Sequence, residues 1–296
     1  MSMIEAVIQG IIQGLTEFLP ISSSGHLSLF QYFTGRNGET GALFSILLHL
    51  GTLLAVCIAF YKTILCMVVE FFAIIRDIFT GRFSFREMSN YRKMIFLLIV
   101  SLLPMAITFL FLDFFSGLSS DNSIVAEGLG FLATSALLTL SVRCVKGRKT
   151  SGTTTYKDAL AMGFMQSVAP IPGISRSGST ISVGLLCGLE REFAVSFSFI
   201  MGVPTVLGAN ILEIGPALKT GLDIPAHALI AGLVASLVFG LLAIWMVRWL
   251  VVGDKFIWFA RYTFVLGVIT LIIGLIDKFA GYPVQQWIIG LVGGGS

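Results

Sequence analysis

Charged residues are scarce in this sequence: Asp, Glu, Lys and Arg together make up 12% of its 296 residues. There are three histidines, four cysteines and eight prolines, whereas 56% of the residues are hydrophobic. A soluble domain usually carries about twice that share of charge. The composition therefore excludes a soluble globular protein. It predicts an all-α polytopic membrane protein, because long apolar runs that can cross about 30 Å of hydrocarbon recur along the chain.

The four cysteines show neither the spacing of metal ligands nor a disulfide pattern, so we interpret them as small buried hydrophobic residues. The net charge of +3 gives no indication of a nucleic-acid partner. The N-terminus lacks a basic region and carries Glu5, so no cleavable signal peptide is expected. The sequence leaves the oligomeric state open, a homodimer included.

Two polar stretches, residues 13–26 and 166–180, interrupt the apolar sequence and resemble one another. They share a Gln followed by Ile-Ser-x-Ser-Gly at a constant offset of 153 positions. The offset holds downstream, where Phe44-Ser45 matches Phe197-Ser198 and Thr52 matches Thr205. An offset held over about forty residues indicates an internal duplication.

Each polar stretch breaks a pair of segments that are too short or too polar to span a membrane. We therefore predict two re-entrant helical hairpins, at residues 3–34 and 158–189. Three full transmembrane helices should follow each hairpin, which makes six in total. The predicted repeats are residues 1–145 and 157–280, within one integrated membrane domain. The predicted spans are 40–61, 94–111 and 123–142 in the first repeat, and 191–215, 225–247 and 261–276 in the second.

Basic residues concentrate in segments 62–93, 143–157 and 248–261, which the positive-inside rule places in the cytoplasm. Both termini and the turns at 112–122 and 216–224 are then expected outside. Because three spans follow each hairpin, the second repeat must be inverted relative to the first. Broken helices of inverted repeats meet near the middle of the membrane, where such folds hold their sites.

The ionisable residues Glu17, His26 and Arg176 all fall at the two breaks. A charge buried in a membrane protein must be paired, hydrated or functional. The N-terminus of the helix after each break favours an anion, and the planar guanidinium of Arg176 matches phosphate oxygens. The predicted phosphate-binding residues are Ser22, Ser24, Gly25, Ser175, Ser177, Gly178 and Thr180.

Phosphoryl transfer also needs a nucleophile and a proton carrier. Ser23 lies three positions before His26, so its hydroxyl is expected within reach of the imidazole. Glu17 either orients His26 or holds a divalent cation, and the sequence does not decide between these roles. Plainer interpretations remain: the serines pack or cap helices, and Glu17 and Arg176 form a structural pair. His49 and His227, with no polar cluster around them, are interpreted as hydrogen-bonding residues without chemistry.

These residues resemble the motifs of the undecaprenyl-diphosphate phosphatase family, also called the BacA family of bacitracin resistance. Its first motif, acid or Gln, three residues, Glu, and then Leu-Pro-x-Ser-Ser-x-Gly-His, is matched from Gln13 to His26. Its second, Pro-Gly-x-Ser-Arg-Ser-Gly-x-Thr, is matched from Pro172 to Thr180. The resemblance covers nearly the whole chain.

The resemblance implies an enzyme of the bacterial plasma membrane that hydrolyses undecaprenyl diphosphate to undecaprenyl phosphate, recycling the carrier lipid for peptidoglycan synthesis. It implies Ser23 as nucleophile, His26 as its proton partner, Glu17 as a metal-binding or proton-handling acid, and Arg176 as the phosphate clamp. It also implies a divalent cation, Mg2+ or Ca2+, and a site open to the outer leaflet. Gln13 stands where many members have Glu, so any metal ligation there would be weaker.

Other classes of protein share parts of this pattern. A secondary transporter or flippase of a polyprenyl phosphate or a small anion also uses inverted repeats with broken helices, but has no need for Ser23 with His26. An acid-phosphatase-type lipid phosphatase needs a second His shortly after its Ser-Arg, and none follows Arg176 before His227. A purely structural protein would leave the three ionisable residues unexplained. A phosphoserine intermediate and direct attack by water both stay open.

Overall fold

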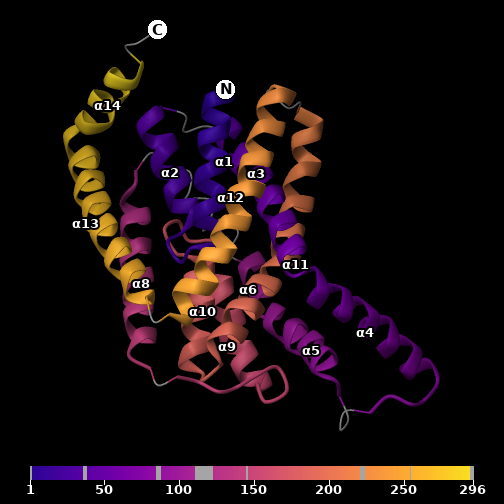
Figure 1. The fold of residues 1–296 in the computed structure, drawn as a ribbon. Helices are drawn as coiled ribbons and strands as arrows, with labels where there is room; N and C mark the ends of the chain where they lie inside the picture. Colours follow the sequence, from indigo (N-terminus) through magenta and orange to yellow (C-terminus); the bar gives the residue numbers. More distant parts are fainter. Residues whose placement is uncertain are drawn as a thin grey trace.

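The computed structural model of the chain describes residues 2–35, 39–84, 88–110, 123–144, 146–220, 224–253 and 255–293. The fold of this part is helical (Figure 1). Its helices are α1 (Met3–Phe18), α2 (Ser23–Thr34), α3 (Glu39–Ala59), α4 (Tyr61–Phe79), α5 (Asn90–Leu102), α6 (Met105–Leu110), α8 (Val125–Val142), α9 (Tyr156–Val168), α10 (Arg176–Leu186), α11 (Arg191–Thr220), α12 (Ala226–Val252), α13 (Phe256–Ala280) and α14 (Pro283–Gly293).

Within the described residues, four helices are long and apolar enough to cross a membrane, namely α8, α11, α12 and α13. α3 and α4 pass the same test only together, and the pair is bent by 82° between Ala59 and Tyr61. The chain is therefore a polytopic helical membrane protein with four or five candidate spans in its described part, rather than the six expected from the sequence.

The missing span is the one predicted at residues 94–111, which is wrong as a single helix. α5 ends at Leu102 and α6 begins at Met105, so Pro104 lies in the interruption. Proline cannot donate a backbone hydrogen bond, and its ring clashes with the preceding turn of a helix. The predicted outer turn at 112–122 lies outside the described residues.

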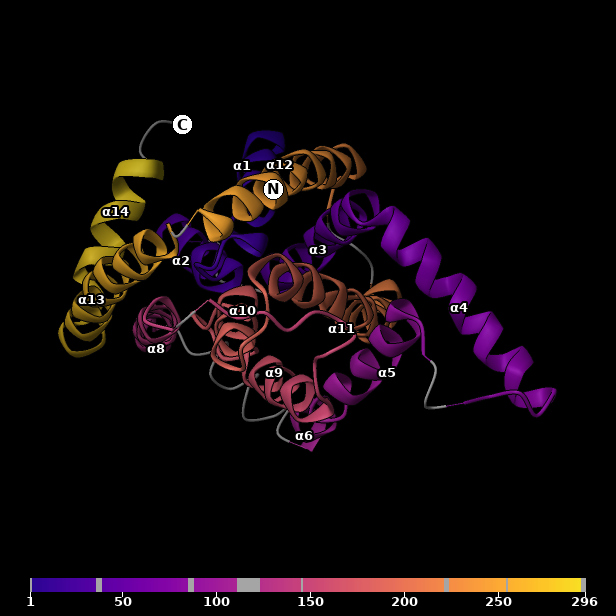
Figure 2. The same cartoon turned by 60° about the horizontal axis from the view of Figure 1, so that its bottom comes forward.

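The predicted cytoplasmic loop at 62–93 contains helix α4 instead of irregular chain. α4 is attached to α5 by Arg92, whose Nε donates to Glu70 Oε2 at 3.1 Å and whose Nη2 donates to Asp77 Oδ2 at 2.9 Å. Large apolar side chains such as Leu65 and Phe72 are exposed on α4. Figure 2 shows α4 projecting to one side of the molecule. The ion pairs to Arg92 thus hold α4 at an angle to the helix that precedes it.

The predicted hairpins are present as two pairs of short helices, α1 with α2 and α9 with α10. α1 packs against α12, and α9 packs against α5. Gly10 of α1 lies against the carbonyl group of Gly232, and Gly163 of α9 lies against the carbonyl group of Ser101, with no room for a Cβ atom at either glycine. Two positions 153 residues apart therefore make the same kind of close contact.

Aromatic packing holds the end of α1 against the middle of the bundle. The ring of Phe199, on α11, lies edge-on to Phe18 and Phe60, with centroids 5.1 Å and 6.1 Å away. Phe18 and Phe199 are fully buried. Because lipid is as apolar as this core, close packing rather than water exclusion positions α1. Glu17 precedes Phe18, so the same packing sets the place of its carboxylate.

Candidate active site

The structure brings the two breaks together in the centre of the bundle. Arg176, the first residue of α10, donates through Nη2 to Oε1 of Glu17 in the last turn of α1. Ser177 Oγ donates to the carbonyl oxygen of Leu19 at 3.3 Å. These contacts join residues that lie more than 150 positions apart in the sequence. The N-termini of α2 and α10 therefore lie at one site, where their partial positive charge favours an anion.

The same cap begins the second helix of each pair. Ser22 Oγ accepts from the N–H of Gly25 at 3.2 Å, and Ser175 Oγ accepts from the N–H of Gly178 at 3.0 Å. Ser22 has a φ of 71°, a left-handed conformation that a serine rarely adopts. The side chains of Ser22 and Ser175 thus hold the shape of the breaks, as the capping interpretation expected.

Apart from that of Ser22, the predicted phosphate-binding hydroxyl groups fall into two sets. Ser24 and Ser175 line the pocket at the breaks together with Ser23. Ser177 and Thr180 are fully buried, and Thr180 Oγ1 lies 2.6 Å from the hydroxyl of Ser198. Their hydroxyl groups face protein, so this geometry does not support direct phosphate contact by these two. Gly25 and Gly178 contribute their N–H groups to the caps.

The pocket at the breaks has a volume of about 270 Å³. Its ionisable lining residues are Glu17, His49 and Arg176, and its polar lining includes Ser23 and Ser24. The rest of the wall comes from α1, α3, α6, the end of α9 and α11. The lining residues are Thr16, Glu17, Ser23, Ser24, Ile46, His49, Met105, Gln166, Ala169, Pro170, Ile174, Ser175, Arg176, Thr205, Val206, Ala209 and Asn210.

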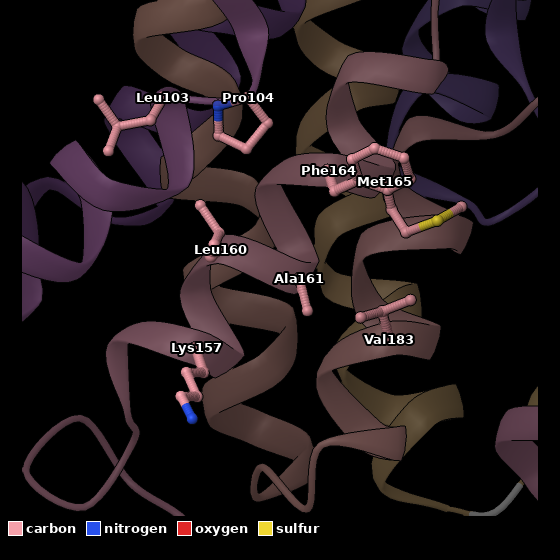
Figure 3. Close-up of a pocket in the computed structure, with 8 residues that line it drawn as sticks. All are labelled: Leu103, Pro104, Lys157, Leu160, Ala161, Phe164, Met165 and Val183. Atoms are coloured by element: carbon pink, nitrogen blue, oxygen red, sulfur yellow. The ribbon is translucent and has the colours of Figure 1, made fainter.

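A larger cavity of about 710 Å³ lies elsewhere, between α5, α6, α9 and α10 (Figure 3). Its wall is apolar apart from Lys157. Phe164 lines this cavity and Gln166 lines the smaller one. Side chains two positions apart on a helix point to nearly opposite sides. The larger cavity thus lies behind α9, away from the two breaks, and brings no candidate catalytic group together.

The carboxylate of Glu17 is the centre of the smaller pocket. Oε2 accepts from the hydroxyl of Ser23 at 2.6 Å and from the amide of Gln13 at 3.0 Å, while Oε1 binds Arg176. Nε2 of His49 lies 3.5 Å from Oε2. All four neighbours can donate a hydrogen, and an ionised carboxylate only accepts. The arrangement therefore suits an ionised Glu17 that holds the Ser23 hydroxyl as an acceptor.

The structure gives Ser23 and His26 other partners than one another. Nδ1 of His26 lies 2.7 Å from the carbonyl oxygen of Ser22, and Nε2 lies 2.7 Å from the hydroxyl of Tyr262. The ring also stacks on Tyr262 and meets Phe131 edge-on. Since both ring nitrogens have other partners, His26 holds the backbone of the first break, and the partner of Ser23 is Glu17.

His49 is the residue of this site that sequence reasoning missed. The sequence pattern predicts a hydrogen-bonding histidine without chemistry, yet His49 lies beside Glu17 and lines the pocket. Its position in the sequence could have identified it, because a histidine within a predicted span is by default a candidate functional residue. His227, which received the same interpretation, is exposed at the start of α12.

The residues expected to hold a divalent cation do not fit one in this arrangement. Among the described residues, no group of three or more His, Cys, Asp and Glu side chains can hold a metal ion. Both oxygens of Glu17 already accept from protein donors, and Gln13 turns its amide nitrogen toward that carboxylate. Mg2+ and Ca2+ need about six or more oxygen ligands, most of which the protein does not supply here.

Comparison with known proteins gives one family. Residues 6–269 match the family model described as bacitracin resistance protein BacA. An undecaprenyl-diphosphatase of Alkaliphilus metalliredigens is 37% identical over 278 residues, which cover 93% of this chain and all of the relative. An undecaprenyl-diphosphatase of Methanosphaera stadtmanae is 37% identical over 93% of this chain and 99% of the relative. A match of this length, with both motifs in one pocket, shows that the chain belongs to the BacA family.

Proposed function

We propose that the pocket at the two breaks is the active site of an undecaprenyl-diphosphatase, the activity for which the relatives are named. One observation carries the proposal: Glu17 accepts the hydroxyl proton of Ser23 and at the same time binds Arg176. The buried carboxylate of Glu17 therefore contacts both a nucleophile, for which it can act as the base, and a cation that can bind phosphate.

Arg176 is suited to bind the terminal phosphate of the lipid. Its Nη2 binds Glu17, and its Nη1 is buried against Gly202 of α11. The guanidinium group also borders the pocket, so its remaining N–H groups can donate to an incoming phosphate oxygen. The N-termini of α2 and α10 add positive potential on the same side of the pocket.

Ser23 is suited to attack this phosphate. Its oxygen forms a bond to the terminal phosphorus, the bond from phosphorus to the bridging oxygen breaks, and polyprenyl phosphate leaves. The hydroxyl proton passes to Oε2 of Glu17, which lies 2.6 Å away. Water then hydrolyses the phosphoserine and releases inorganic phosphate. His26 supports the reaction indirectly, by holding the carbonyl group of Ser22, the residue before the nucleophile.

We further propose that the chain is a multi-pass protein of the bacterial plasma membrane, built from inverted repeats at 1–145 and 157–280. In this arrangement α5 and α6 complete a sixth crossing, and both hairpins are re-entrant. Both termini lie at one end of the molecule in Figure 1, and the basic connection after α8 lies at the other. This supports a cytoplasmic basic end, termini outside, and a site reached from the outer leaflet.

Release of phosphate from undecaprenyl diphosphate by the purified protein tests the function. Ser23→Ala should lower kcat at least 1,000-fold, since it removes the nucleophile. Ser196→Ala is the control, because that hydroxyl donates within its own helix, to the carbonyl oxygen of Glu192. Acid quenching and mass spectrometry of the wild type should find phosphate on Ser23. Unchanged turnover in Ser23→Ala would exclude the serine mechanism, and lipid movement without phosphate release would indicate a transporter.

A further inference from the structure

The two halves of the molecule place different side chains around Glu17 from equivalent positions. Residue 49 of α3 corresponds to residue 202 of α11 at the offset of 153, and α3 packs against α11. The first half has His49 at this position and the second has Gly202. Arg176 fills the space that a side chain at Gly202 would occupy. Glu17 therefore lies between one permanent cation and one titratable side chain.

The hydrogen bonds of His49 determine which ring nitrogen titrates. Nδ1 lies 2.8 Å from the carbonyl oxygen of Ser45, and a carbonyl only accepts, so Nδ1 carries a hydrogen. Nε2 is then the nitrogen that gains or loses a proton. It lies 3.5 Å from Oε2 of Glu17. A hydrogen on Nε2 would therefore face the carboxylate of Glu17, which can accept it.

His49 is also accessible to a substrate. Its side chain is 27% exposed, against 6% for Glu17. Of the ionisable groups in the described chain, Glu17 from α1 and Arg176 from α10 share the pocket with it. Glu17 faces the imidazole through Oε2, and Arg176 binds the opposite oxygen of the same carboxylate.

We propose that His49 is a further acid–base residue of the hydrolysis, protonating the leaving polyprenyl phosphate and then deprotonating water. The inference rests on the proposed function. In the first step Ser23 gives its proton to Glu17, and Nε2 of His49 gives its own to the bridging oxygen as the bond to phosphorus breaks. Ser23 and His49 both face Oε2 of Glu17, so the two proton transfers take place around one carboxylate.

The second step returns both groups to their starting state. Water attacks the phosphorus of the phosphoserine, and its proton passes to the neutral Nε2 of His49. The bond from phosphorus to Ser23 Oγ breaks, Oγ regains its proton from Glu17, and inorganic phosphate leaves. One water is consumed, and no proton or electron is left over. A residue that acts as acid in one step and base in the next is expected of a two-step hydrolysis.

Substitution of His49 by Gln separates this role from a structural one. The Gln amide can still donate to Glu17 but cannot titrate. We expect kcat for undecaprenyl diphosphate to fall about 100-fold with KM little changed. The pH–rate profile of His49→Gln should differ from that of the wild type, because the amide has no proton to exchange. His227→Gln is the matched control, because His227 is exposed outside the pocket.

Chemical rescue gives an independent measurement. His49→Ala enlarges a pocket of about 270 Å³, and added imidazole should restore part of its activity. Ser23→Ala should not respond to imidazole. Wild-type kcat and an unchanged pH profile in His49→Gln, with Ser23→Ala inactive, would overturn the role of His49 alone. Full activity of Ser23→Ala would instead overturn the proposed function.

Discussion

Arg176 occupies the space that a side chain at Gly202 would fill: a Cβ atom on Gly202 would coincide with Nη1 of Arg176. The guanidinium group can reach Glu17 only because α11 leaves this space open. At the equivalent position α3 carries His49, on the other oxygen of the same carboxylate. The two copies of the duplicated segment thus place a guanidinium group and an imidazole on the two oxygens of one acid.

The substitution Gly202→Ala should displace the guanidinium group of Arg176 and lower kcat/KM about 100-fold, comparable with the loss of a transition-state donor. Gly208→Ala, on the same helix, is the control, since a Cβ there meets no atom within 4 Å. That change should leave activity intact and stabilise α11 by up to about 1 kcal/mol. Phosphate release and thermal unfolding of both variants check the prediction. Equal activity of the two would show that Arg176 need not lie at Gly202.

The substitution Arg176→Lys should keep the charge but lose about 100-fold or more in kcat/KM. Arg176 binds Glu17 through Nη2 while its planar guanidinium group borders the pocket, and a single ammonium group cannot reproduce both contacts in this fixed geometry. The exposed Arg82→Lys is the control. Kinetics with undecaprenyl diphosphate decide the outcome. A near wild-type rate would show that Arg176 does not act as the phosphate clamp.

Residues close to the breaks could be predicted because local chemistry determines them. Proline, glycine and serine end one helix and cap the next, whatever surrounds them. Glu17, Ser23 and Arg176 could be assigned to one site because the duplication and the positive-inside rule together imply that the breaks meet. The structure places these three in direct contact.

The remaining features depend on contacts between distant parts of the chain. No proline or glycine marks the bend before α4, whose orientation depends on Arg92 binding Glu70 and Asp77. The ring of His26 turns from Ser23 because Tyr262 lies 236 positions away in sequence but within hydrogen-bonding distance. His49 reaches Glu17 only once α3 packs on α1. None of these contacts can be predicted from sequence spacing alone.

The substitution His26→Ala should weaken the fold as well as the activity, because the hydrogen bond to the Ser22 carbonyl group is lost where the backbone is strained. We expect a loss of about 1–3 kcal/mol in stability and a partial fall in kcat. Tyr262→Phe keeps that hydrogen bond and should cost less in both. Thermal unfolding in detergent and phosphate release check this. Complete inactivity of His26→Ala at unchanged stability would restore His26 as the base for Ser23.

Removal of divalent cations by EDTA should stop turnover, and Mg2+ or Ca2+ should restore it. We expect the cation to bind mainly to the diphosphate of the lipid, because both oxygens of Glu17 already accept from protein donors. Calorimetry with lipid-free protein should then detect no tight cation binding. Micromolar binding that disappears in Glu17→Gln would place the cation on the protein instead.

Cysteine labelling tests the orientation of the chain in the membrane. In a variant with Cys57, Cys66, Cys144 and Cys187 replaced, Ser151→Cys should react with an impermeant maleimide only after the cells are opened. Ser151 follows the basic residues after α8, which favour the cytoplasm. Ser119→Cys, in the predicted outer turn and outside the described residues, should react in intact cells. The reverse pattern would show that the chain has the opposite orientation, with its pocket reached by substrate from the inner leaflet.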